Sequence, residues 1–170
     1  MRVQRLFSVV LAVGALATAA PAAQACAPSP WQPYRTSPFV DEAGTTCAFE
    51  VKGDIVVDQE RIRTLATGPN GAPTEQEITG PLTIRFTNTA SGASVTRDLA
   101  GTGWLYYHSD GTQTWVVSGH ISLGIHVGNP YESPGEWVYD GRTVLETHPG
   151  VGPQVLSHQG ATENLCTVLG

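Results

Sequence analysis

The residues whose types could do chemistry gather on one predicted strand. Ser118, His120 and His126 lie on the same face of it, because alternate residues of a strand share a face. Two histidines suggest a metal site, which needs both imidazole nitrogens about 2 Å from one ion. His120 and His126 are instead about 20 Å apart, at roughly 3.3 Å for each strand residue, and only a sharp fold at Gly124 would bring them together. We therefore predict no metal site and no cofactor.

The same strand offers a serine and a histidine for nucleophilic catalysis. Ser118 and His120 are about 7 Å apart along the strand, and the chain has no Gly-x-Ser-x-Gly turn that would present a serine. The carboxylates are scattered, so no pair for glycoside hydrolysis stands out. Asp54, Asp58 and Glu60 share the face of an earlier strand, where we predict contact with solvent rather than a cation site. We assign no catalytic residue.

Aromatic side chains are better candidates for binding, because their rings can stack on sugars or lipids. Large aromatics also dominate small β cores. We predict the core role for Trp104, Tyr106, Trp115, Trp137 and Tyr139. Surface contacts are then left to residues on the second face of the strands or in loops. These candidate binding residues are Tyr107, His120, His126 and Tyr131.

Most of these residues belong to one long predicted β-hairpin, from Trp104 to Val127, with Asp110-Gly111 at its tip. Asp-Gly is a strong turn signal, because glycine tolerates positive φ. A loop of two or four residues puts Tyr106 opposite Trp115, whereas a loop of three would shift the register by one and exchange the faces. We expect the first register. Its core face is Trp104, Tyr106, Trp115, Val117, Ile121, Leu123 and Ile125.

The remaining pattern is that of further half-buried strands separated by loops rich in glycine and proline. A second hairpin is expected around Asp140-Gly141, and Gly119 and Gly124 are expected to bend the long strand that follows the first tip. The sequence thus predicts an all-β fold, an antiparallel β-barrel or strongly bent β-sandwich of about eight strands. Other predicted strands are 47–58, 61–66, 82–87, 95–99 and 154–158.

The start of the chain has the parts of an export signal. Arg2 and Arg5 precede an apolar run, and Ala23-Gln24-Ala25 forms a small-residue cleavage site. The run is shorter than the about 20 apolar residues that span a bilayer. A lipid on Cys26 is the alternative to free secretion. We predict a secretory signal over 1–25, a Pro-rich arm over 26–46 and a single β domain over 47–170.

Charge limits the partners. Loss of Arg2 and Arg5 from the nine Lys and Arg leaves seven basic side chains against 15 acidic ones. An acidic chain without a basic run disfavours nucleic acid and anionic membrane surfaces. We expect a monomer with no nucleic-acid partner and no transmembrane segment.

Three cysteines, Cys26, Cys47 and Cys166, allow three single disulfides, and spacing alone leaves the pairing open. An oxidising exterior favours a bridge. One between Cys47 and Cys166 would tie the start of the β domain to its end. It would stabilise the fold by about 4–5 kcal/mol in the chain-entropy account.

Four segments carry a resemblance: Cys47–Val51, Phe86–Val95, Ser109–Thr112 with Ser118-Gly119 after it, and Asn164–Cys166. In these segments, over about residues 47–168, the chain resembles a group of small secreted proteins of high-GC Gram-positive bacteria. In that group a first cysteine is followed by an Asn/Thr-Gly hairpin, an Asp-Gly hairpin and a last cysteine. Ser91-Gly92 stands here where Thr-Gly is usual. The resemblance implies a bacterial protein with a Cys47–Cys166 bridge and brings no particular activity.

We therefore expect a secreted, non-enzymatic domain that binds a small molecule, a glycan or a cell-envelope component through a preformed apolar cavity or patch. One alternative is a small barrel enzyme that acts on an apolar substrate, with His120 or His126 as general base. Another is a structural or interaction protein of the cell surface. A hollow interior lined by Trp, Tyr and a histidine would favour binding or catalysis over the structural role.

Overall fold

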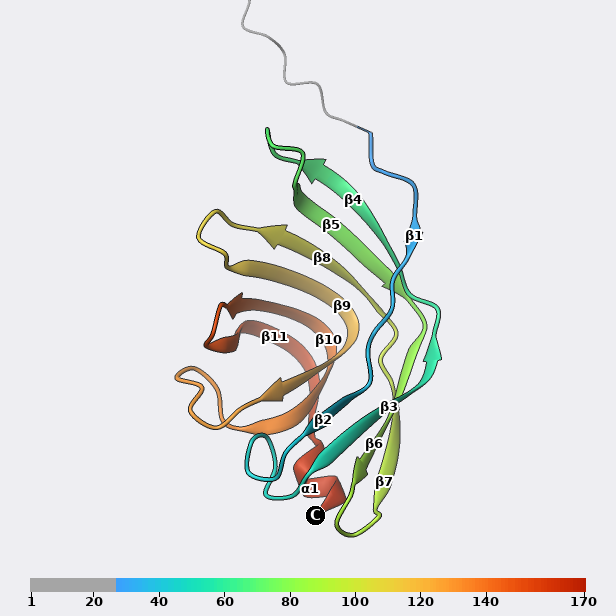
Figure 1. Ribbon diagram of the computed structural model, residues 1–170, viewed down its shortest axis with the longest axis vertical. Coiled ribbons are helices and arrows are strands. Elements are labelled where there is room, and N and C mark those ends of the chain that lie inside the picture. The colour runs from blue at the N-terminus through green and yellow to red at the C-terminus, as the bar shows by residue number, and fades with distance from the viewer. Residues whose placement is uncertain (1–26) are drawn as a thin grey trace, which may run out of the picture.

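A computed structural model describes residues 27–170 as two antiparallel β-sheets and a short C-terminal helix (Figure 1). The predicted export signal and Cys26 lie outside the described residues. The larger sheet has seven strands in the order β1-β4-β5-β8-β9-β10-β11, and the smaller has four in the order β2-β3-β6-β7. The elements are β1 Gln32–Pro33, β2 Phe39–Asp41, β3 Val51–Asp58, β4 Arg61–Thr67, β5 Pro73–Gly80, β6 Leu82–Asn88, β7 Ser94–Asp98, β8 Gly101–Tyr107, β9 Gln113–Ile125, β10 Gly135–His148, β11 Gly152–Asn164 and α1 Leu165–Leu169.

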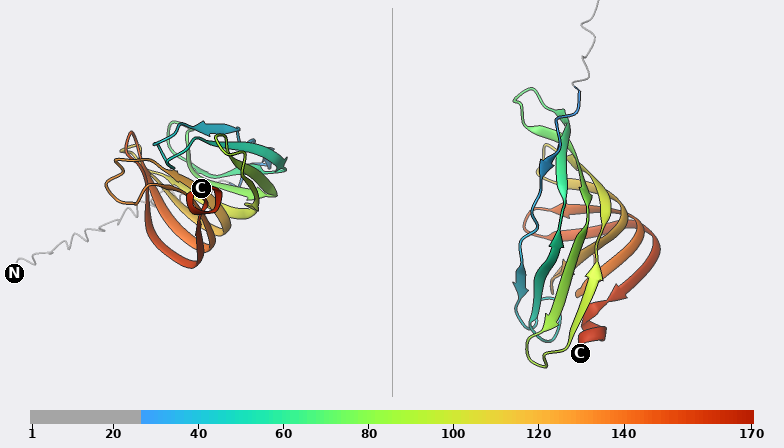
Figure 2. Two further views of the ribbon diagram at one scale, coloured as in Figure 1. Left: turned by 90° about the horizontal axis from the view of Figure 1, so that it is seen from below. Right: turned by 90° about the vertical axis from the view of Figure 1, so that its right-hand side faces the viewer.

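The predicted all-β, antiparallel character is confirmed, but the strand number and the closed form are not. There are 11 strands rather than about eight. Within residues 27–170 no barrel closes, because β1 and β11 end the larger sheet and β2 and β7 end the smaller one. Four chain segments instead pass from one sheet to the other: β1 to β2, β3 to β4, β5 to β6 and β7 to β8. The two sheets are therefore joined at a shared corner, which both views of Figure 2 show.

A row of glycines crosses the larger sheet, and we call it the glycine crease. Gly80 lies opposite Gly101, which lies opposite Gly119; Gly119 lies opposite Gly141, and Gly141 opposite Gly160. Gly119, Gly141 and Gly160 have φ values of 105°, 126° and 148°, a conformation that L side chains rarely adopt. A Cβ on Gly160 would overlap the carbonyl oxygen of Asp140. The strands can therefore bend sharply along this row (Figure 1).

The crease corrects two expectations about bends. The hairpin expected around Asp140-Gly141 is wrong, because β10 runs through that dipeptide as one strand paired to β9 and β11 on either side. Its Asp-Gly marks a kink rather than a turn. Gly119 does lie at a bend, whereas Gly124 has no positive φ. Glycine within a strand pattern thus indicated a change in strand direction. The pattern alone did not distinguish a kink within one strand from a turn between two strands.

The register expected for the long hairpin is also wrong. Leu105 lies opposite Trp115, and Tyr106 lies opposite Thr114. The tip is a three-residue loop in which the His108 N–H donates to the Thr112 carbonyl (3.0 Å) and Gly111 has φ 86°. That loop shifts the register by one position and exchanges the faces of β8 relative to β9, on which Val117 and Ile125 are buried as expected. Leu105 is consequently 3% exposed and Tyr106 37% exposed, so Tyr106 is not a core residue.

The main core fills the space between the smaller sheet and the last turns of the chain. Its fully buried members include Val51, Phe86 and Leu165. The Cys47–Cys166 disulfide, which the resemblance implied, joins the segment before β3 to α1 across 119 residues of sequence. The arm also contributes, because Phe39 packs edge-on against Phe86 at 6.1 Å between ring centroids. The arm is thus anchored on the smaller sheet at β2.

Candidate functional site

A cleft of about 300 Å³ opens where the arm passes the glycine crease. Segments far apart in sequence meet there: the arm between β1 and β2, the corner between β3 and β4, and strands β5, β6, β8, β9 and β10. Sheet pairing on both sides holds these segments, since β1 pairs with β4 and β2 with β3. The cleft is therefore part of the folded scaffold and does not depend on a single loop.

Two glycines of β8 form part of the cleft lining. Gly101 belongs to the crease, and a Cβ there would lie 3.0 Å from the His120 carbonyl oxygen. Gly103 differs, because a Cβ there would have its nearest neighbour, Leu105 Cδ1, at 3.8 Å. That is ordinary contact, so the backbone at Gly103 tolerates a side chain. The space left beside Gly103 belongs to the cleft.

Most of the lining is apolar. It draws on both sheets and on the arm, so the cleft walls are continuous with the core. The side chains concerned are Phe39, Ile78, Leu82, Ile84, Leu99, Trp115, Val117, Ile121, Leu123 and Leu145.

A polar group of arm and corner residues lines the same cleft. The Thr36 hydroxyl donates to Glu60 Oε2 at 2.6 Å, and Tyr34 lies beside them. Burial raises the pKa of the Glu60 carboxyl, and the nearby charge of Asp58 raises it further, against the hydrogen bond from Thr36. Burial likewise raises the pKa of Tyr34, with Glu60 and Asp58 adding to the shift. The Glu60 carboxyl group is thus partly withdrawn from water.

His120 lines the cleft from β9. It lies directly opposite Asp140 of β10, and its Nε2 is 3.3 Å from Asp140 Oδ1. Its peptide N–H donates to the Ala100 carbonyl at 3.1 Å, which fixes the strand at the crease. A carboxylate beside an imidazole can orient the ring through a hydrogen bond.

The other predicted binding residues lie elsewhere. The Tyr107 hydroxyl donates to Gln76 Oε1 at 2.6 Å on β5. His126, just beyond β9, has its Nε2 3.8 Å from Asp41 Oδ1. Tyr131, in the loop before β10, packs its ring 5.2 Å from that of His148. Of the four predicted residues, only His120 lines the cleft.

Sequence reasoning missed Tyr34, Thr36 and Glu60 as cleft residues. Glu60 was assigned to a solvated strand face, but the chain turns between β3 and β4 at that point and takes it out of the strand pattern. Tyr34 and Thr36 belong to the Pro-rich arm, to which no binding role was assigned. The usable signal was the spacing of prolines in the arm, which keeps it extended beside the sheets. Residues 27–170 contain no group of three or more His, Cys, Asp or Glu placed to hold a metal ion.

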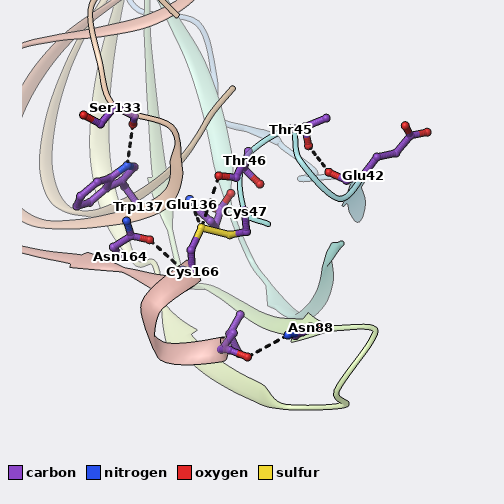
Figure 3. The surroundings of a disulfide bond; sticks show 11 residues. Glu42, Thr45, Thr46, Cys47, Asn88, Ser133, Glu136, Trp137, Asn164 and Cys166 are labelled. Carbon is purple, nitrogen blue, oxygen red and sulfur yellow. Dashed lines mark hydrogen bonds between the residues drawn. A yellow bond between two sulfur atoms is a disulfide. The ribbon is translucent and has the colours of Figure 1, made fainter. Parts of the chain in front are cut away.

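The carboxyl group of Glu136 is buried close to Thr46 and the Cys47–Cys166 bridge (Figure 3). Asp41 and Gly124 lie beside it, and we call this region the disulfide end. Glu136 is 1% exposed, and its Oε2 has no hydrogen-bond partner among residues 27–170. A Cβ on Gly124 would lie 3.1 Å from that oxygen and 3.2 Å from Asp41 Oδ2, so both carboxyl groups face the same gap. Burial, and then the charge of Asp41, raise the pKa of Glu136 to about 8.

No protein-family profile matches the chain, and no curated protein or solved structure is significantly similar to it. Nothing in residues 27–170 is a helix of the length and apolar character needed to cross a membrane.

Proposed function

We propose that the protein binds a small, largely apolar molecule in the cleft without changing it chemically. The observation that carries the proposal is the cleft itself: about 300 Å³, with mainly apolar walls and a few polar side chains. Ligand sites in proteins have this make-up, with volumes from about 300 Å³ upward. Apolar walls supply affinity and the polar group orients the ligand.

The proposed setting is outside the cell membrane. Residues 1–25 have the pattern of an export signal, and the Cys47–Cys166 disulfide is typical of oxidising compartments. The ligand is then a free small molecule or the apolar portion of a glycan or envelope component. At about 300 Å³ the cleft holds one small molecule or one short chain, rather than a polymer.

A graded filling of the cleft at Gly103 tests the proposal. The series Gly103→Ala, Gly103→Val and Gly103→Leu adds bulk where a Cβ meets no atom closer than 3.8 Å. We expect the affinity for the fluorescent probe N-phenyl-1-naphthylamine to fall at each step, with a loss of about tenfold or more for Leu, since each occupied CH2 volume is worth about 0.8 kcal/mol. Fluorescence titration measures the affinity.

The control places the same leucine outside the cleft, at exposed Thr96 on β7. Thr96→Leu is expected to leave probe affinity unchanged, and circular dichroism must show native strand content in every variant. If the folded Gly103→Leu variant binds the probe as the parent does, the cleft is not the binding site.

A second candidate function is hydrolysis or rearrangement of a small apolar substrate with His120 as general base. The observation that favours it is the His120–Asp140 pair on the cleft wall. His120→Gln separates the two candidates, since it removes the base and leaves the apolar walls. Loss of turnover of a small ester with probe binding retained supports catalysis, whereas binding without turnover in the parent protein supports the binding role alone.

A further inference from the structure

We propose that the cleft selects organic cations, an ammonium group attached to an apolar body, over neutral and anionic molecules of the same size. This inference rests on the proposed binding function and adds the charge class of the ligand. It is carried by the position of one carboxylate, by the absence of a basic partner for it in residues 27–170, and by the aromatic rings beside it.

The charge of the lining is negative. Among residues 27–170, Glu60 is the one carboxylate that lines the cleft, and no lysine or arginine of this range lines it. None of the ion pairs formed within residues 27–170 involves Glu60. Its only side-chain partner there is the Thr36 hydroxyl, which satisfies one oxygen with a neutral donor. The Glu60 carboxylate is therefore free to form an ion pair with a bound ligand.

Arg35, which precedes Thr36 in the arm, pairs with another carboxylate. Arg35 Nη1 lies 3.5 Å from Asp58 Oδ1, and the Arg35 side chain is 64% exposed. Asp58 also accepts the peptide N–H groups of Thr36 (3.0 Å) and Glu60 (3.1 Å). Arg35 thus balances Asp58, and Glu60 stays without an opposite charge. The raised pKa of Glu60, which burial and Asp58 cause, is the expected sign of such a carboxylate.

Aromatic rings lie in the same lining. Tyr34 and Phe39 come from the arm, and Trp115 comes from β9. Ring faces attract cations, most strongly where water is excluded. A carboxylate and aromatic rings around an apolar space suit an ammonium group joined to a hydrocarbon body. An anion would meet the same groups at a cost, because Glu60 repels it.

His120 is the one basic side chain among the residues of 27–170 that line the cleft. Its Nε2 already faces Asp140 Oδ1 at 3.3 Å. Any positive charge on the imidazole is therefore neutralised by the Asp140 carboxylate. The balance of the lining still favours a cation.

Three ligands with the same chain and different head groups test the inference: octylamine, 1-octanol and octanoate. Octylamine is charged at pH 7, as a lysine side chain is. Each competes with N-phenyl-1-naphthylamine for the parent protein in about 0.15 M salt, which screens distant charges beyond about 8 Å. We expect octylamine to compete about tenfold better than 1-octanol, and octanoate to compete worst.

Glu60→Gln removes the charge and keeps the shape. It is expected to bring the octylamine to 1-octanol ratio close to one, with little change for 1-octanol. The matched control is Glu42→Gln, which removes one charge from an exposed residue outside the cleft and should keep the full ratio. Equal effects of the two substitutions would assign the preference to net charge and overturn the inference.

The outcomes test the charge preference separately from the proposed binding function. Octanoate competing as well as octylamine, with the Gly103 series still blocking the probe, overturns the charge preference and leaves the binding role standing. Failure of all three ligands and of the probe overturns the binding role itself. If Glu60→Gln does not fold, the order of the three ligands on the parent protein still decides the matter.

Discussion

Glu60 in the cleft and Glu136 at the disulfide end are both carboxyl groups withdrawn from water, and their surroundings differ. Glu60 is partly exposed and accepts a hydrogen bond from Thr36. Glu136 is 1% exposed, has an unpartnered oxygen and is covered by segments that the disulfide joins. A ligand can reach the first carboxyl group, whereas only a proton can compensate the second without unfolding. The first is available for binding, and the second affects stability.

The two regions are connected through the arm. Phe39 lines the cleft, and Asp41, two residues later on β2, faces Glu136. The Phe39 ring also covers Gly53 of β3, where a Cβ would overlap it. The disulfide end therefore holds the strand from which the arm extends across the cleft. Loosening that end should weaken the cleft, whereas changes in the cleft should leave that end intact.

The largest expected effect comes from removing the disulfide. Replacing both Cys47 and Cys166 with alanine releases a loop of 119 residues. The free energy of unfolding should fall by about 4–5 kcal/mol, since loops of this length restrict the unfolded chain most. Urea unfolding followed by tryptophan fluorescence measures it. A loss under about 1 kcal/mol would mean that side-chain packing alone stabilises the disulfide end. The contrast drawn between the disulfide end and the cleft would then be wrong.

The next effect is a pH dependence that comes from Glu136. Its pKa is about 8 in the folded protein and near 4.5 when exposed, so between these values the folded state binds the extra proton. Stability is then present at low pH and is lost as the pH rises through this window, because the unfolded state binds fewer protons. We expect a fall of about 3 kcal/mol from pH 5 to pH 8.

Glu136→Gln isolates that effect, because its neutral amide resembles the protonated acid. In this variant the free energy of unfolding should decrease much less between pH 5 and pH 8. At pH 8 the variant should be more stable than the parent protein. The groups that face Glu136 are Asp41 from β2, Thr46 and Gly124, with His126 reaching Asp41 at 3.8 Å. Urea unfolding at several pH values measures the slope. An unchanged slope in Glu136→Gln would assign the pH dependence to other groups.

The sequence predicted the class of fold better than its shape. Alternation in Phe86 and its neighbours gave the strands, because one face of each is buried. The sheet to which each strand belongs could not be predicted, since the short links from β5 to β6 and from β7 to β8 carry no sign that the chain changes sheet. The glycine crease depends on which glycines lie opposite each other. Which glycines face each other is set by the strand register. At the Asp110-Gly111 tip, one additional loop residue was enough to change that register.

The cleft was still harder to predict. His120 was found because histidine on a strand face is conspicuous, whereas Thr36 and Glu60 carry no local pattern that marks a cleft. They meet only after the arm has paired along β4 and β3. Glu136 was hidden for a related reason. It follows a loop, alternates like any strand residue, and is buried by segments that come from the opposite end of the domain.

The smallest effect on stability is expected from Glu60→Gln, the same substitution made in the cleft. Glu60 is only half-buried, so solvent screens its charge and the free energy of unfolding should change by less than about 1 kcal/mol. Its pKa is raised, so ionisation of Glu60 also lowers stability as the pH rises, but weakly. Urea unfolding at pH 5 and pH 8 should therefore give Glu60→Gln nearly the parent slope, in contrast to Glu136→Gln. If Glu60→Gln flattened the slope as strongly, the cleft carboxyl group would be as sealed as the one at the disulfide end. A ligand could then reach it only through local unfolding, and binding would be slow and limited by the opening of the arm.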